Sequence, residues 1–273
     1  MTKPGTDRIT AAFTQAQQKQ TAALMPYFTL GYPDAETSLD IIEAIAPYSD
    51  LLELGVPFSD PLADGPTVQH STQVSLENGT TTASCLAMVR ELRQRGVQTP
   101  VMLMGYVNPF YRFGWERLVD LAAAASVDGF IIPDLPPEES DEVVERVRAA
   151  NMDLVFLASP NTPSERLAII NRRSSGFIYA VSVTGVTGAR KKLPRETTEF
   201  LRRLRRETDH PVLIGFGISN AETAVQMSKE GSGVIIGSAV IDLIAKSPGL
   251  KSAQKAVFDF VSRVKAAMQR ENR

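Results

Sequence analysis

The chain has 273 residues, of which 43% are apolar and 22% are charged, with a formal net charge of −2 and a pI near 5.8. This length suits one large α/β barrel, and the near-neutral charge argues against binding to nucleic acid or to an anionic membrane surface. The single cysteine, Cys85, excludes an intramolecular disulfide. Because the chain also lacks an apolar signal segment and any run near the ~20 apolar residues of a membrane span, we expect a cytoplasmic protein.

Short apolar runs alternate with amphipathic stretches along the whole chain. The runs are apolar throughout instead of alternating with polar residues, which is typical of strands buried on both faces of a parallel sheet. Eight such strands are predicted, at Leu24–Leu30, Leu51–Gly55, Val101–Gly105, Gly129–Pro133, Leu154–Ala158, Phe177–Ser182, Val212–Phe216 and Gly233–Ile236.

Helical patterns lie between these strands and at both ends of the chain. After an extra N-terminal helix near Thr6–Lys19, they cover Ser38–Ala46, Thr82–Arg95, Trp115–Ala125, Glu138–Ala150, Pro163–Arg173, Glu196–Glu207, Ala221–Lys229 and Leu250–Met268. Eight strand–helix units indicate an α/β protein, a single (β/α)8 TIM barrel over residues 1–273 with an extra N-terminal helix. The alternative is an open doubly wound sheet, which we disfavour because no Gly-x-Gly-x-x-Gly follows the first strand.

Two connections stand out from the others. The longest one after a strand is Val56–Thr81, and we expect it to carry a short helix of its own. The segment Thr184–Pro194 is rich in glycine and in cationic residues, and we expect it to be mobile.

The most specific motif is Leu-Glu-Leu-Gly-Val-Pro-Phe-Ser-Asp-Pro-Leu-Ala-Asp-Gly-Pro, at residues 52–66. It puts Glu53 inside an apolar strand and Asp64 in the loop that follows. A carboxylate on a buried strand is costly unless it is paired, hydrogen-bonded or used in chemistry. Two acids held near one another can perform acid–base catalysis. The alternatives are that Glu53 is a structural acid bonded to the backbone and that Asp64 is a turn residue before glycine.

The ends of the last three strands carry the pattern of a phosphate site. Glycine at Gly217 and Gly237 lets backbone N–H groups approach an anion closely. A helix that begins at Ser238 would point its free N–H groups and its dipole at the same anion. Barrels often bind phosphate between the loops after strands 7 and 8, and Gly188 in the sixth loop would close over it. Each glycine taken alone is equally typical of a simple turn.

Two other kinds of mechanism are disfavoured. A Schiff-base aldolase needs a lysine in the barrel, and none of the predicted strands contains one. A zinc site is disfavoured because the two histidines, His70 and His210, are far apart and Cys85 has no partner. The chemistry that remains is acid–base catalysis by carboxylates on a phosphorylated substrate, without a metal or a cofactor in this chain.

Residues 52–66, together with Gly185-Val186-Thr187-Gly188, Gly215-Phe216-Gly217-Ile218 and Gly237-Ser238-Ala239, resemble the tryptophan synthase alpha chain family. The resemblance covers essentially the whole chain from Pro26 onward. It implies a (β/α)8 barrel that cleaves indole-3-glycerol phosphate to indole and glyceraldehyde 3-phosphate. It also implies a complex of two alpha and two beta chains, in which the beta chain carries pyridoxal phosphate and joins indole to serine.

The resemblance implies a role for each residue that matches the family. Glu53 matches the general acid/base and Asp64 the second catalytic carboxylate, while Thr187 would bond to Asp64 when the sixth loop closes as a lid. The indole pocket matches Tyr27, Met104, Ile131 and Phe216, with Tyr179 on its polar side, and the partner-facing surface matches Pro57, Asp60 and Asn108. This chain has Tyr27 and Tyr32 where some members carry Phe and Asp.

Three alternatives stay open at this point. Indole-glycerol-phosphate synthase or phosphoribosylanthranilate isomerase would show a strand lysine or a cysteine–aspartate pair, which this chain lacks. A barrel that serves only as an allosteric subunit would tolerate the loss of Glu53 or Asp64. A stand-alone lyase that makes indole would not need the interface-like run Pro57–Asp60.

Overall fold

The computed structural model describes residues 6–181 and 195–270, and the features reported below belong to these residues. Their strands form one parallel sheet in the order β5-β4-β3-β2-β1-β9-β8-β7-β6. The strands are β1 (Ala23–Thr29), β2 (Leu52–Gly55), β3 (Val101–Met104), β4 (Gly129–Ile131), β5 (Asp153–Val155), β6 (Leu157–Ala158), β7 (Ile178–Ala180), β8 (Val212–Ile214) and β9 (Gly233–Ile236).

The two strands at the ends of this order, β5 and β6, are consecutive in the chain. Only Phe156 separates them, so together they take one strand position, with β5 paired to β4 and β6 paired to β7. Nine short strands therefore fill the eight positions of a closed barrel, and the predicted (β/α)8 fold is confirmed. All eight predicted strands are present, each within a few residues of its expected bounds.

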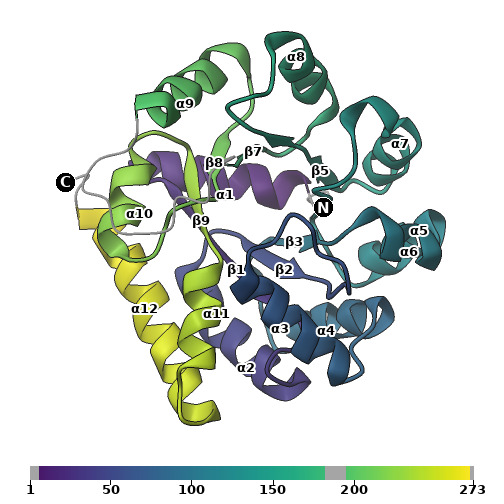
Figure 1. Cartoon of the computed structure of the whole chain (residues 1–273), viewed down its shortest axis with the longest axis vertical. Coiled ribbons are helices and arrows are strands. Elements are labelled where there is room, and N and C mark those ends of the chain that lie inside the picture. Colours follow the sequence, from purple (N-terminus) through teal and green to yellow (C-terminus); the bar gives the residue numbers. More distant parts are fainter. Residues whose placement is uncertain (1–5, 182–194, 271–273) are drawn as a thin grey trace.

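The helices surround the strands (Figure 1). They are α1 (Thr6–Gln18), α2 (Ala35–Ile45), α3 (Pro66–Glu77), α4 (Thr82–Gln94), α5 (Val107–Phe113), α6 (Trp115–Ala124), α7 (Asp141–Ala149), α8 (Ser164–Arg173), α9 (Arg195–Glu207), α10 (Ala221–Ser228), α11 (Ser238–Ala245) and α12 (Leu250–Arg270), with 3-10 turns η1 (Ala46–Tyr48) and η2 (Pro137–Glu139). Every predicted helix is present, and α3 is the expected helix within residues 56–81. None of the described helices has the length and apolarity needed to cross a membrane.

Helix α5 was not expected from the sequence. No helix was predicted between the third strand and Trp115, and Pro109 is the third residue of α5. The first four N–H groups of a helix have no partner within the helix, so a proline in the first turn loses no hydrogen bond. The helix orients Tyr106, which directly precedes it as its N-cap residue.

Asp128 lies just before β4 and ties three parts of the barrel together. Its carboxylate is fully buried and lies 2.7 Å from Arg8 Nε of α1 and 2.8 Å from Arg93 Nη2 of α4. The backbone N–H of Val101, at the start of β3, donates to Asp128 Oδ2 at 2.8 Å. Helix α1 crosses behind the strands in Figure 1. This ion cluster therefore closes the amino-terminal end of the barrel and leaves the carboxyl ends of the strands facing the viewer.

Candidate active site

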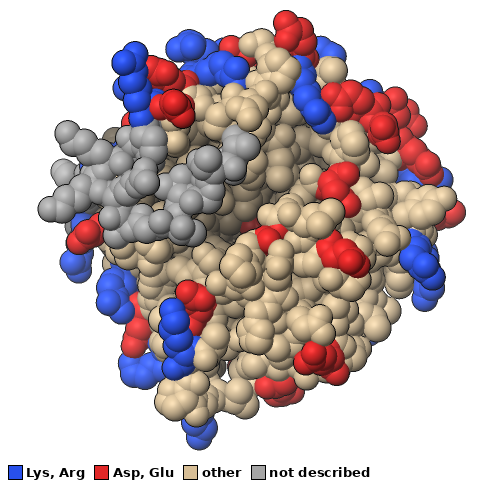
Figure 2. All heavy atoms as spheres, viewed as in Figure 1, with Lys and Arg blue, Asp and Glu red and all other residues tan. Residues whose placement is uncertain are grey.

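A cavity of about 540 Å³ lies at the carboxyl ends of the strands, which is a typical size for a small-molecule site. In Figure 2 the centre of this face is hollowed and is framed largely by uncharged residues. The cavity brings together the predicted residues Tyr27, Glu53, Asp64, Met104, Ile131, Tyr179, Phe216, Gly217, Gly237 and Ser238. The predicted Thr187 and Gly188 lie outside the described residues.

Glu53 is buried in the wall of the cavity, with only 2% of its surface exposed. Its register neighbour on β1 is Tyr27, and the hydroxyl of Tyr179 on β7 hydrogen-bonds to its carboxyl group. Burial raises the pKa of Glu53 to about 8, and the nearby Asp64 carboxylate adds to this rise, whereas the Tyr179 bond opposes it. Glu53 therefore holds a proton at neutral pH.

The second carboxyl oxygen of Glu53, Oε2, is buried and has no hydrogen-bond partner among the described residues. A buried polar atom without a partner needs an explanation, because most such atoms in proteins are paired. Here the atom belongs to a residue that lines the cavity, so the unpaired oxygen lies in the cavity wall. Glu53 thus combines an interaction with Tyr179 with one carboxyl oxygen that has no partner among the described residues.

Asp64 enters the cavity from the loop between β2 and α3. Its Oδ2 accepts a hydrogen bond from the Tyr106 hydroxyl at 2.8 Å. Burial raises the pKa of Asp64 to about 6, and the bond from Tyr106 works against this rise. The two carboxyl groups therefore have pKa values on opposite sides of pH 7, so that Asp64 is mostly ionised while Glu53 is mostly protonated. Such a separation marks an acid and an anionic partner in one site.

Two strand-end glycines make room for the tyrosines of the cavity. A Cβ atom at Gly55 would collide with the Tyr27 hydroxyl, and a Cβ atom at Gly215 would collide with the Tyr179 ring. These close approaches explain why β2 ends in glycine and why a glycine directly follows β8. The absence of a side chain lets each ring lie across the end of the neighbouring strand.

The predicted phosphate donors lie along one side of the cavity. Gly217 has a positive φ of 70°, a conformation that glycine adopts without strain. Helix α11 begins at Ser238, as predicted, and its N-cap residue Gly237 provides no side-chain cap. The first N–H groups of α11 are therefore available to an anion, and the helix dipole favours one there. Asp242, one turn further along α11, also lines the cavity.

Two residues of the site were not predicted from the sequence: Asp242, which lines the cavity, and Tyr106, whose hydroxyl donates to Asp64. Tyr106 directly follows the predicted strand Val101–Gly105, so its place at a strand end was a usable signal. Asp242 is four residues after Ser238, a spacing that brings both side chains to one face of a helix. Among the described residues, no group of three His, Cys, Asp or Glu side chains is placed to hold a metal ion.

A smaller hollow of about 460 Å³ lies on the outer side of the Asp64 loop. The predicted interface residues Asp60 and Asn108 line it together with Phe58, Leu62, Ala63, Tyr106 and Asp134. Leu62 is 93% exposed, which is unusual for a large apolar side chain. Pro57, the third predicted interface residue, is buried.

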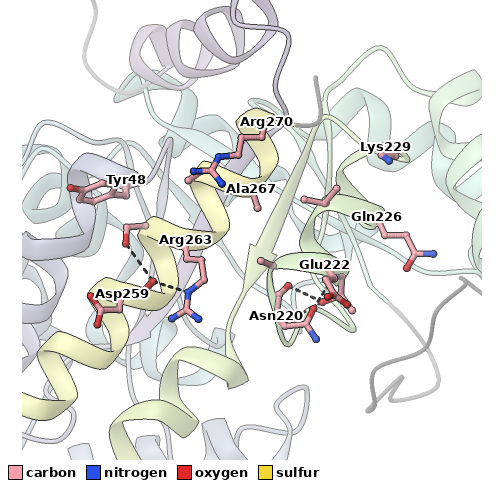
Figure 3. Close-up of a pocket in the computed structure, with 14 residues that line it drawn as sticks. Tyr48, Asn220, Glu222, Gln226, Lys229, Asp259, Arg263, Ala267 and Arg270 are labelled. Carbon is pink, nitrogen blue, oxygen red and sulfur yellow. Dashed lines mark hydrogen bonds between the residues drawn. The ribbon is translucent and has the colours of Figure 1, made fainter. Parts of the chain in front are cut away.

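A larger hollow, of about 1420 Å³, lies elsewhere on the molecule, between α10 and α12. Figure 3 shows that its labelled walls carry side chains of both signs, including Glu222, Lys229, Asp259, Arg263 and Arg270. It contains neither carboxylate of the candidate site. The cavity of about 540 Å³ at the carboxyl ends of the strands is therefore the candidate site.

Comparison with known proteins finds relatives over most of the chain. The family model "Tryptophan synthase alpha chain" matches residues 13–270. The tryptophan synthase alpha chain of Roseiflexus castenholzii is 46% identical over 92% of this chain and 97% of its own length. The crystal structure of tryptophan synthase subunit alpha from Legionella pneumophila strain Paris covers 96% of this chain and 98% of its own, at 32% identity and a TM-score of 0.89. The tryptophan synthase complex of Pyrococcus furiosus contains a chain that is 38% identical, with a TM-score of 0.82, over 89% of this chain and 98% of its own.

Proposed function

Because this chain belongs to the tryptophan synthase alpha chain family, we propose that Glu53 and Asp64 catalyse its reaction. The chain is the alpha subunit of tryptophan synthase, a carbon–carbon lyase of tryptophan biosynthesis. It cleaves indole-3-glycerol phosphate to indole and glyceraldehyde 3-phosphate. The observation that carries the assignment of residues is the pair of cavity carboxyl groups, the buried Glu53 and the partly buried Asp64, whose pKa values lie near 8 and near 6.

The retro-aldol step requires two proton transfers, and one residue can make both. Protonated Glu53 gives its proton to C3 of the indole ring, which turns the ring nitrogen into an electron sink. The ionised Glu53 then takes the proton from the side-chain hydroxyl next to the ring. The carbon–carbon bond breaks, its electron pair restores the indole, the hydroxyl carbon becomes the aldehyde, and Glu53 is protonated again.

Asp64 acts on the charge that develops during this step. Protonation of C3 places positive charge near the ring N–H, and an ionised carboxylate fixed nearby stabilises it. Apolar and aromatic side chains at Met104, Ile131 and Phe216 suit the flat ring. We assign the phosphate to Gly217, Gly237 and Ser238, and we add Gly188 and the lid residue Thr187 by resemblance to the family.

We expect Asp64→Asn to lower kcat for indole release by about 10²–10³-fold, the usual loss when one preorganised electrostatic contact to a transition state is removed. Asparagine keeps the shape of the side chain but lacks the negative charge. The assay follows indole release from indole-3-glycerol phosphate by the purified chain. Asp120→Asn, an exposed position on α6, is the matched control, and equal activity in both variants would remove Asp64 from the mechanism.

We also propose a beta-chain partner, in a complex of two alpha and two beta chains. Support comes from the similarity to a chain of the Pyrococcus furiosus tryptophan synthase complex and from the hollow that Asp60, Leu62 and Asn108 help to line. Leu62 offers apolar surface at its edge, as interface anchors do. We expect pyridoxal phosphate on the beta chain and no cofactor on this one, because Glu53 and Asp64 provide the acid–base chemistry of the cleavage.

The proposed partner surface predicts the effect of replacing the exposed residue Leu62. We expect Leu62→Asp to weaken binding of a beta chain by roughly 10- to 100-fold, since an interface anchor contributes about 2 kcal/mol or more. Indole release is measured while a beta chain is titrated into the assay, and Leu121→Asp on α6, at another partly exposed apolar position, is the control. The activity without partner should stay unchanged. An unaltered titration curve for Leu62→Asp would place the partner elsewhere.

A further inference from the structure

Tyr106 joins two consecutive residues of the loop that carries Asp64. Its hydroxyl oxygen accepts a hydrogen bond from the Ala63 backbone N–H at 3.1 Å. The same hydroxyl donates to Asp64 Oδ2 at 2.8 Å. A phenol has one hydrogen, and an amide N–H cannot accept, so the hydrogen of Tyr106 is committed to the Asp64 carboxylate.

The Tyr106 side chain is itself held firmly. Only 3% of the residue is exposed, and its ring packs against Phe58 with 5.4 Å between ring centroids. It is the N-cap residue of α5, whose first backbone N–H, on Val107, donates to Asp134 Oδ1 at 2.9 Å. The phenol group therefore cannot leave Asp64 without disturbing a packed ring and the start of a helix.

Tyr27 also lies near both carboxyl groups, but its hydrogen points elsewhere. Ser71 Oγ donates to the Val68 carbonyl at 2.8 Å. Thr29 Oγ1, 2.7 Å from Ser71 Oγ, must then act as the donor of that pair. The Tyr27 hydroxyl, 3.1 Å from Thr29 Oγ1, must in turn donate to Thr29. This chain of hydroxyl groups leaves Tyr27 no hydrogen for a carboxylate.

We propose that Tyr106 is a positioning residue for the cleavage reaction, and that its hydroxyl keeps Asp64 ionised and oriented so that the proton of the carboxylate pair stays on Glu53. The proposal rests on the roles of Glu53 and Asp64 given above. The charged and titratable groups around Asp64 are Glu53 on β2, Tyr27 on β1, Tyr179 on β7 and Tyr106 before α5, while Asp134 faces Tyr106 from the loop after β4.

The energetics support this geometry. Burial raises the pKa of Asp64, and the hydrogen bond from Tyr106 is the interaction that lowers it. Without that bond the pKa of Asp64 moves upward, toward that of Glu53. The two acids then compete for one proton. A smaller fraction of the molecules therefore has Asp64 ionised and Glu53 protonated, which is the arrangement that the reaction needs.

The test is Tyr106→Phe, which keeps the ring that packs on Phe58 and removes only the hydroxyl. We expect kcat for indole release to fall roughly 10- to 100-fold, as for the loss of a hydrogen bond to a charged group. We also expect the acidic limb of the pH profile of kcat/KM to move to higher pH. Carbon-13 NMR of labelled aspartate carboxyl groups reads the titration of Asp64 directly, with its signal assigned by its loss in Asp64→Asn. Tyr111→Phe, an exposed tyrosine on α5, is the control.

A second variant guards against a folding defect. 3,5-Difluorotyrosine at position 106 keeps the hydroxyl and makes it a stronger donor, so the acidic limb should move to lower pH, opposite to the shift in Tyr106→Phe. Opposite shifts in the two variants support the proposal. An Asp64 titration that is unchanged in both overturns it, even if kcat falls. Wild-type activity in Asp64→Asn would instead refute the underlying function, so the two failures can be told apart.

Discussion

Glu53→Gln is expected to lower kcat for indole release by about 10²–10⁴-fold, the range that general acid–base catalysis contributes. Glutamine has nearly the same shape and fits the buried position on β2, but it can neither supply the proton for C3 of the ring nor accept one from the hydroxyl. The loss should fall on kcat more than on KM, because the residue transfers protons in the chemical step and does not contribute to substrate binding. Indole release by the purified variant is the measurement.

The control for this variant is Glu145→Gln, at an exposed position of α7. It should keep the activity of the unaltered chain, and circular dichroism should be the same for all three proteins. A loss smaller than about tenfold in Glu53→Gln would contradict its role as acid and base. Recovery of activity in Glu53→Gln on addition of a beta chain would also contradict this role, since a partner cannot supply the missing proton.

The pH dependence of the reaction follows from the two carboxyl groups. The active arrangement has Asp64 ionised and Glu53 protonated, so kcat/KM should rise through pH values near 6 and fall through values near 8. The free energy of unfolding should also depend on the protonation of Glu53. Its pKa in the folded chain lies above the ordinary value of 4.5, so the free energy of unfolding falls as the pH rises from about 4.5 to about 8. Glu53→Gln should flatten this part of the pH–stability profile.

Asp128→Ala is expected to destabilise the barrel by about 3 kcal/mol or more, because it leaves two arginines without their buried counter-ion. Arg93, with only 11% of its side chain exposed, cannot exchange the lost carboxylate for water at no cost. The Val101 N–H at the start of β3 loses its acceptor as well. We expect the midpoint of thermal unfolding to fall by roughly 6 °C or more, measured by circular dichroism.

Asp120→Ala on α6 is the matched control for this prediction, because Asp120 is exposed, and its midpoint should shift little. Asp128 does not line the cavity that contains Glu53, so the folded fraction of Asp128→Ala should cleave its substrate at the normal rate. A midpoint within 2 °C of the unaltered chain would mean that the cluster does not hold α1 and α4 to the sheet.

The sequence was sufficient to predict the fold because each strand is a continuous apolar run. Runs such as residues 51–55 and 101–105 are legible in isolation, since a strand buried on both faces must be apolar at every position. The sequence was less informative where one residue is compatible with two local structures. Pro109 can end an ordered segment or begin a helix, and the second meaning depends on the turn before it. The single-domain organisation over residues 1–273 and the cytoplasmic location stay predictions.

The sequence by itself determined the eight-unit barrel, the two catalytic candidates Glu53 and Asp64 and the start of a helix at Ser238. Only the tertiary structure decided which phenol serves which carboxyl group. Tyr27, Tyr106 and Tyr179 all follow or lie within predicted strands, and nothing in their local sequence distinguishes them. Hydrogen-bond direction depends on partners far away in the chain, as with Thr29 and Ser71, and a pKa depends on burial by the whole barrel. Local patterns set the elements, whereas the proton positions arise only where separate strands meet.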